Sequence, residues 1–152
     1  MITTVTSVRG QRPRSGRRLV VLLPVLLSAL LVGCNPNSEL PGEGTWRVIN
    51  YWALWCSPCR EEIPVLNALD AQAEITVLGV NFDSKEGAEL EDHRRQLGIE
   101  FAPAPVNPSE IFGTPKPQVL PTTLLVNPQG VLVETLIGPQ TEASILAAIA
   151  SH

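Results

Sequence analysis

The sequence predicts a three-layer α/β domain in which a central mixed sheet lies between layers of helices. Strand-like and helix-like segments alternate along residues 46–97, and ITVLGVN at 75–81 is a nearly continuous apolar run, typical of a strand covered on both faces. The tetrapeptide NPQG at 127–130 separates two further strand-like runs, as a hairpin turn does. We therefore expect the order strand, helix, strand, helix, a proline-rich crossover, and then two antiparallel strands and a helix.

The first 33 residues are predicted to be a signal peptide rather than part of this domain. Five arginines within residues 1–18 precede an apolar run of 14 residues at 19–32, which Pro24 interrupts. A helix that spans a bilayer needs about 20 apolar residues, so the run is short for a permanent anchor. Its length and its basic flank are those of a signal-peptide core.

The apolar run ends in LVGC at 31–34, which resembles the bacterial lipobox. The resemblance implies that Cys34 is lipidated and becomes the first residue of a lipoprotein in the bacterial cell envelope, facing the periplasm. An ordinary signal peptide with a cysteine at its cleavage site is the alternative. Asn35 is not the aspartate that usually accompanies inner-membrane retention, which favours the outer membrane. Residues 34–45 then form the lipidated cysteine and a flexible tether, and 46–152 form the domain.

The first strand is expected at 46–52 and the first helix at 58–73. Pro58 suits the first turn of a helix, where its missing N–H would have no partner in any case. Pro64 lies inside this helix and is expected to kink it. The helical spacing is carried by Ile63, Leu66, Leu69 and Ala73.

Ser84 is predicted to cap a polar helix over 85–97 that ends at Gly98. Residues 101–121 contain six prolines and are expected to be mostly loop, with one short strand near Phe101.

The last two strands are predicted at 122–126 and 131–137, and Thr141 is expected to cap a final helix that reaches Ala150.

Composition excludes several classes of function. After residue 33 the chain holds 6 basic and 15 acidic residues, so it has no electrostatic attraction for nucleic acid. Three cysteines are too few for a disulfide framework, and a four-ligand zinc site would need His93 or His152, which are poor candidates.

The hexapeptide WCSPCR at 55–60 carries the chemistry. Two cysteines three apart at a helix start can form a small disulfide loop and open it again. Cys56 is placed where helix N–H groups favour a thiolate, and Cys59, one turn in, is placed to resolve a mixed disulfide. Haem attachment would require histidine at position 60, which is arginine, and zinc would require two further ligands.

Residues 48–64, VINYWALWCSPCREEIP, resemble the active-site block of the thioredoxin superfamily. More narrowly they are similar to the TlpA/ResA-like disulfide reductases, whose pattern is W-C-x-P-C-R-x-E-x-P. The segment LPTTLLV at 120–126 resembles the second block of that group. The resemblance covers about residues 45–150 and implies a thioredoxin-like fold with an extra βα element, over 83–113, before a cis-proline loop.

The resemblance also implies residue roles. Cys56 would be the attacking thiolate and Cys59 the resolving thiol, while a cis Pro121 would leave neighbouring backbone free to bind an extended peptide. The surface on which a substrate docks would be formed by Trp55, Pro58, Leu120 and Thr122.

Glu62 is the remaining candidate. Cytoplasmic thioredoxins have a buried aspartate where this chain has Asn50, and the TlpA/ResA-like group places a glutamate near the cysteine pair instead. A partly buried Glu62 would have a raised pKa and exchange protons with Cys59. The alternative is that Glu62 faces solvent, as Glu61 is expected to do.

Reduction of protein disulfides is the favoured activity, with no cofactor or metal. Strong oxidants of the DsbA type have histidine inside CxxC, whereas Ser57-Pro58 is closer to the Gly-Pro of thioredoxin. The resemblance implies a membrane electron donor of the DsbD/CcdA kind, and apocytochrome c is one candidate substrate. Three alternatives stay open: a disulfide oxidase or isomerase, a thiol peroxidase, and a copper-binding lipoprotein. No Pro-x-x-x-Thr-x-x-Cys pattern surrounds Cys56, and neither the added histidine nor the CxxxC spacing of copper carriers is present.

Overall fold

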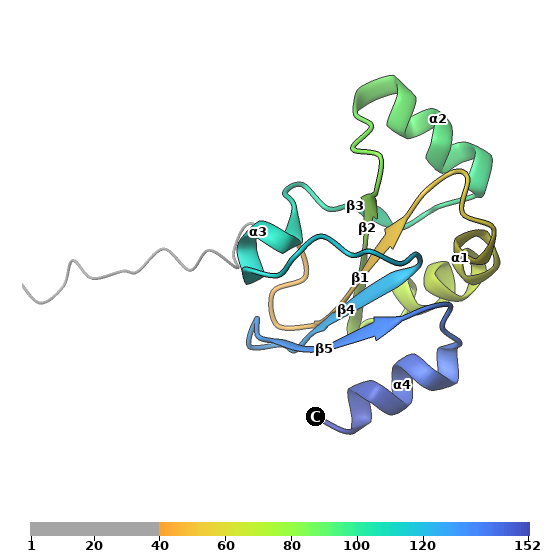
Figure 1. The fold of residues 1–152 in the computed structure, drawn as a ribbon. Coiled ribbons are helices and arrows are strands. Elements are labelled where there is room, and N and C mark those ends of the chain that lie inside the picture. Colours follow the sequence, from red (N-terminus) through yellow and green to blue (C-terminus); the bar gives the residue numbers. More distant parts are fainter. Residues whose placement is uncertain (1–39) are drawn as a thin grey trace, which may run out of the picture. The chain divides into compact units, whose positions relative to one another are not determined.

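Five strands form one mixed sheet in the order β3-β2-β1-β4-β5 (Figure 1). The computed structural model describes residues 40–152, so the predicted signal peptide, Cys34 and the first part of the tether lie outside the described residues. β1 pairs in parallel with β2 and antiparallel with β4, and β4 pairs antiparallel with β5. The strands are β1 (Trp46–Trp52), β2 (Ile75–Asn81), β3 (Ala102–Pro103), β4 (Thr122–Val126) and β5 (Leu132–Ile137). The helices are α1 (Ser57–Asp70), α2 (Gly87–Leu97), α3 (Pro108–Phe112) and α4 (Glu142–Ala150). The predicted α/β class and the mixed sheet are confirmed.

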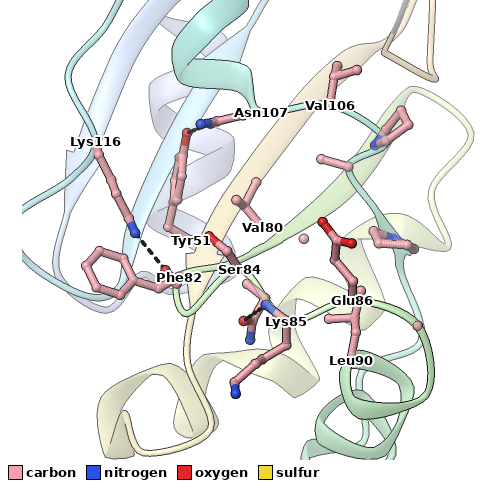
Figure 2. A pocket seen from close by; sticks show the side chains of 16 residues that line it. Tyr51, Val80, Phe82, Ser84, Lys85, Glu86, Leu90, Val106, Asn107 and Lys116 are labelled. Atoms are coloured by element: carbon pink, nitrogen blue, oxygen red, sulfur yellow. Dashed lines mark hydrogen bonds between the residues drawn. The ribbon is translucent and has the colours of Figure 1, made fainter.

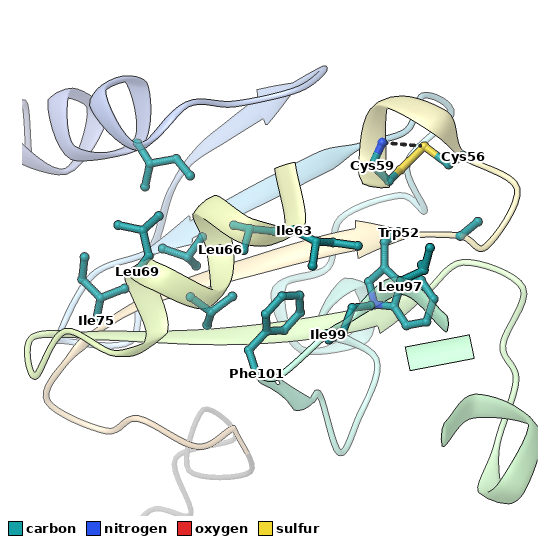
Figure 3. Close-up of a cluster of buried hydrophobic side chains, with 14 of the residues drawn as sticks. Trp52, Cys56, Cys59, Ile63, Leu66, Leu69, Ile75, Leu97, Ile99 and Phe101 are labelled. Atoms are coloured by element: carbon teal, nitrogen blue, oxygen red, sulfur yellow. Dashed lines mark hydrogen bonds between the residues drawn. A yellow bond between two sulfur atoms is a disulfide. The ribbon is translucent and has the colours of Figure 1, made fainter. Parts of the chain in front are cut away.

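β1 lies at the centre of the sheet and is buried on both faces. Because successive side chains of a strand point to opposite faces, Val48 and Trp52 join one apolar cluster while Ile49 and Tyr51 join the other. The first cluster packs under α1 and α4 and includes the disulfide (Figure 3). The second packs under α3 and the segment that begins at Leu40.

α1 ends three residues before the predicted boundary. The Asp70 carboxylate accepts a hydrogen bond from the Val77 backbone N–H at 2.8 Å, and the chain turns after Asp70 toward β2. Pro64 lies inside α1, and the helix continues past it.

The prediction that Ser84 caps the second helix is wrong. α2 begins at Gly87, and its N-cap is Glu86, which makes no side-chain capping bond. Ser84 has φ of 53°, whereas an N-cap residue has extended backbone, and its N–H donates to the Asn81 carbonyl at 3.0 Å in a turn. The predicted end at Gly98 is confirmed, since this residue adopts the left-handed conformation.

The proline-rich crossover contains the expected short strand, β3, and also a helix that was not predicted. α3 begins after Asn107, whose side-chain oxygen accepts the Ser109 N–H, and it ends at Gly113 with φ of 61°. An Asn-Pro start and a glycine end are ordinary helix boundaries, so the pattern was present in the sequence but was outweighed by the density of prolines.

The C-terminal hairpin and helix are confirmed. The second strand begins at Leu132, one residue later than predicted, and Thr141 forms a reciprocal capping box with Ser144 at the start of α4. Across residues 40–152, no helix combines the length and the apolar character that crossing a membrane would require.

Candidate active site

A disulfide joins Cys56 and Cys59 where β1 gives way to α1, with 5.3 Å between the two Cα atoms. Cys56 is the N-cap of α1, and its sulfur accepts the Cys59 backbone N–H at 3.2 Å. Cys59 is fully buried and Cys56 is 4% exposed. A helix N-terminus favours negative charge, so the geometry stabilises a thiolate at Cys56 once the disulfide is reduced.

The residues around the pair fix the loop that carries Cys56. Pro58 occupies the first turn of α1, as predicted. The Arg60 guanidinium donates to the Leu54 carbonyl at 3.1 Å, so this exposed arginine braces the loop 53–56 from the first turn of the helix.

Trp55 precedes the pair and is 65% exposed, in contrast to the buried Trp52. Its indole N–H donates to both carboxylate oxygens of Asp83, at 3.2 and 3.0 Å, and its ring meets Phe82 edge-on with centroids 6.2 Å apart. The Lys116 ammonium lies 4.0 Å from the centroid of the Phe82 ring and donates to the Phe82 carbonyl (Figure 2). An exposed aromatic side chain beside the disulfide is thus held in one orientation. Sequence reasoning missed the supporting residues, because they lie far along the chain and match no short motif.

Glu62 is buried, with 2% of its surface exposed, so the alternative in which it faces solvent is wrong, whereas Glu61 is exposed. One carboxylate oxygen accepts from the Asn50 amide at 2.5 Å and the other accepts from the Gln140 backbone N–H at 3.0 Å. Burial raises the pKa of Glu62 above its ordinary value, while the hydrogen bonds from Gln140 and Asn50 lower it in part. Since Cys59 is three residues earlier on the same helix, the two side chains are neighbours.

The Leu120–Pro121 peptide bond is cis, the isomer that the resemblance implies. The Pro121 carbonyl accepts from the Gly138 N–H at 2.9 Å, and the Thr122 hydroxyl donates to the Val119 carbonyl at 2.7 Å. Because β1 and β4 are antiparallel, with Thr122 opposite Tyr51, the start of β4 lies beside the end of β1. Pro121 is therefore at the same edge of the sheet as the loop that carries the disulfide.

Two hollows open at this edge. One, of about 460 Å³, lies at the end of β2 (Figure 2), and the other, of about 350 Å³ with mostly apolar walls, flanks the Pro121 loop. The second has Val119 and Ile137 in its wall, and both are more than half exposed. Within residues 40–152, no cluster of three or more His, Cys, Asp or Glu side chains is arranged to hold a metal ion.

Comparison with known proteins places this site in a family. Residues 36–135 match the AhpC/TSA family. The chain belongs to that family. It is 30% identical over 110 residues to thiol-disulfide oxidoreductase ResA of Bacillus cereus, covering 70% of this chain and 62% of that protein. It is 28% identical over 112 residues to ResA of Bacillus subtilis, covering 71% of this chain and 60% of that protein.

The chain thus spans about 60% of the length of the curated relatives named ResA. Among solved structures, it is similar to StoA from Bacillus subtilis, at 24% identity and a TM-score of 0.54 over 69% of this chain and 82% of the other. A DsbF homologue from Corynebacterium diphtheriae matches at 25% identity and a TM-score of 0.59, over 72% of this chain and 73% of that one. The thioredoxin-like fold and the resemblance to the TlpA/ResA-like group are confirmed.

Proposed function

We propose that the protein is a thiol-disulfide oxidoreductase that reduces protein disulfides through Cys56 and Cys59. One observation carries the proposal: a disulfide at the start of α1 has a buried carboxylate, Glu62, on the next turn of the helix. The similarity to proteins named thiol-disulfide oxidoreductase supports the same reaction class.

The reaction transfers two electrons from the reduced pair to a substrate disulfide. The Cys56 thiolate attacks one substrate sulfur, which forms a mixed disulfide and releases the other substrate sulfur as a thiolate. Cys59 then loses its proton and attacks the Cys56 sulfur. This step forms the Cys56–Cys59 disulfide and releases the second substrate sulfur as a thiolate, and protons complete the two product thiols.

Glu62 is proposed to accept the proton of Cys59 in the second step. Cys59 is fully buried, so its proton needs a neighbouring acceptor within the protein. A carboxylate whose pKa is raised by burial is closer to the operating pH than an exposed one, and it therefore transfers protons more effectively in both directions.

The substrate is proposed to dock as an extended peptide between the exposed Trp55 side chain and the Pro121 loop. Trp55 and Pro58 lie on the cysteine side, and Leu120 and Thr122 flank Pro121 on the other. The exposed Val119 and Ile137 extend an apolar surface beside that loop, which suits unfolded or partly folded polypeptide.

The setting is proposed to be the bacterial cell envelope, with the domain anchored through a lipid on Cys34. A dithiol in an oxidising compartment must be recharged, so a membrane electron donor of the DsbD/CcdA kind is part of the proposal, with apocytochrome c as a candidate substrate.

The reduction potential of the Cys56–Cys59 pair tests the direction of the reaction. The full chain carrying Cys34→Ser, in detergent, is equilibrated in thiol–disulfide buffers, and the reduced fraction is counted by alkylation and mass spectrometry. We expect a potential near or below about −200 mV, as in reducing members of the fold. A value near −120 mV would instead identify a disulfide oxidant, and reduction would not be the physiological activity.

A further inference from the structure

Asn50 lies in the middle of β1, is fully buried, and touches the proposed proton acceptor. Its amide nitrogen donates one hydrogen bond to Glu62, at 2.5 Å, and a second to the Thr123 hydroxyl, at 3.1 Å. A single side chain thus joins the carboxylate on α1 to β4, two residues after Pro121.

The other end of the Asn50 amide makes no contact that would account for its burial. Its carbonyl oxygen is buried and has no hydrogen-bond partner among residues 40–152. A buried polar atom without a partner is unfavourable for folding, and the neighbours Val48, Ile49 and Trp52 on the same strand are apolar. Asn50 is thus an unfavourable residue for the middle of β1, and of its two hydrogen bonds the one to Glu62 is the one that reaches the proposed proton acceptor.

The second carboxylate oxygen is also linked to the Pro121 loop. It accepts from the backbone N–H of Gln140, two residues after Gly138, whose own N–H donates to the Pro121 carbonyl. One oxygen of Glu62 is thus bonded to a side chain that also bonds β4, and the other is bonded to the backbone two residues after the one that bonds Pro121.

We propose that Asn50 is a positioning residue for Glu62: its amide donates to the carboxylate and fixes it beside Cys59. The inference rests on the proposed role of Glu62 as the proton acceptor for Cys59. Asn50 acts only through Glu62 and touches neither the cysteines nor the substrate in the proposed mechanism.

The groups around Glu62 are neutral, so the titration of Glu62 reports loss of the Asn50 hydrogen bond. Asn50 from β1 and the Gln140 N–H from the loop before α4 are neutral, and Thr123 from β4, bonded to Asn50, is neutral as well. Cys59 is the titratable neighbour on α1 itself, and no charged side chain contributes to the shift of the Glu62 pKa. Loss of the Asn50 donor removes a bond that favours the charged carboxylate, so the pKa of Glu62 must rise further.

The test uses the full chain carrying Cys34→Ser, in detergent, so that only the cysteine pair reacts. The reduced protein is mixed with the disulfide of thionitrobenzoate. Release of the second thionitrobenzoate reports attack by Cys59. We expect Asn50→Leu to slow this second phase about tenfold at pH 7 and to move its inflection upward by about one pH unit. Thr123→Val is the matched control, because it leaves the Asn50–Glu62 bond in place and should keep the wild-type inflection.

A double-mutant cycle separates positioning from a structural role. In a Glu62→Gln background, Asn50→Leu should change the second phase less than about twofold, because the group through which it acts is gone. An equal loss in both backgrounds would overturn the inference. If Glu62→Gln alone leaves rate and pH profile unchanged, the proposed function of Glu62 fails instead.

A direct titration of the Glu62 carboxyl tests the inference without kinetics. It also provides a test if the Asn50→Leu protein does not fold. The ¹³C resonance of the Glu62 carboxyl, assigned by its loss in Glu62→Gln, is followed against pH in the oxidised protein. Asn50→Asp has the same shape but places a second carboxyl against Glu62, so one of the two must titrate at higher pH than Glu62 does in the wild type. An Asn50→Asp protein in which neither carboxyl titrates at higher pH than Glu62 does in the wild type would contradict the proposal.

Discussion

Glu62 holds a buried carboxylate, and its burial contributes to the way in which the stability of the protein depends on pH. Its two hydrogen bonds favour the charged form, but burial is the largest influence on its pKa and acts in the opposite direction. The folded protein therefore binds the Glu62 proton more tightly than the unfolded chain, in which the pKa is near its ordinary value of 4.5.

This difference predicts a pH-dependent loss of stability that Glu62→Gln removes. Below the unfolded pKa the carboxyl is neutral in both states, and its contribution is fully present. As pH rises through the folded pKa, that contribution is lost, at about 1.4 kcal/mol for each unit by which folding raises the pKa. We expect the free energy of unfolding of the wild type, relative to Glu62→Gln, to fall as the pH rises above about 4.5 and to level off above the raised pKa of the folded state.

Denaturant unfolding of the oxidised proteins at a series of pH values measures this difference. Glu61→Gln is the matched control, because Glu61 is exposed and lies next to Glu62 in the sequence. A wild type that gains stability relative to Glu62→Gln as the pH rises would show that the pKa is lowered rather than raised.

At the scale of single residues, the sequence allows prediction of those site residues that belong to short motifs. Cys56, Cys59 and Pro58 are readable because their spacing alone defines the start of the helix and the disulfide loop. Asp83 beneath Trp55 is not readable, because that contact joins residues 28 apart, and only the folded sheet brings them together.

At the scale of elements, the packing of β2 against the core requires a glycine at position 79. An added Cβ at Gly79 would lie 2.9 Å from side-chain atoms of both Phe101 and Trp52. Both rings belong to the core cluster beneath α1 and are essentially buried, so neither can move away freely (Figure 3).

Gly79→Ala is therefore expected to destabilise the domain by about 1–3 kcal/mol, the usual range for overpacking a close-packed core. Thermal and denaturant unfolding measure the change. Adding Phe101→Leu should recover part of the loss in the Gly79→Ala background while destabilising the wild type. A Gly79→Ala protein as stable as the wild type would show that the rings shift at no cost.

The sequence predicts the elements well where the hydrophobic periodicity is regular, and poorly where the conformation of a turn sets the boundary of a helix. β1, β2 and β4 match their apolar runs, because strands buried in the middle of a sheet need such residues throughout. The start of α2 differs from the prediction because serine is a good capping residue by type, but the positive φ of Ser84 does not allow the extended backbone of an N-cap.

At the scale of the whole molecule, the segment 40–45, which leads into β1, packs against the end of the sheet opposite the disulfide. Leu40 is 2% exposed in the second apolar cluster, and the Arg47 guanidinium donates to the Pro41 carbonyl at 2.8 Å. The chain is thus packed against the domain from Leu40 onward. Only residues 35–39 separate Leu40 from Cys34 in the sequence. Prediction from sequence placed the boundary at 46, because an irregular segment carries no periodicity even when its side chains are buried.

Cys34 is expected to hold the mature protein on a membrane, and Cys34→Ser is expected to release it. Two acyl chains on one cysteine give stable binding where a single chain gives only marginal binding. Full-length wild type and Cys34→Ser, produced in a bacterium, are separated by membrane fractionation, and the mature N-terminus is identified by mass spectrometry. Cys56→Ser, with Cys34 intact, is the control and should stay with the membrane. A wild-type chain whose mature N-terminus carries no lipid on Cys34 would exclude this anchor.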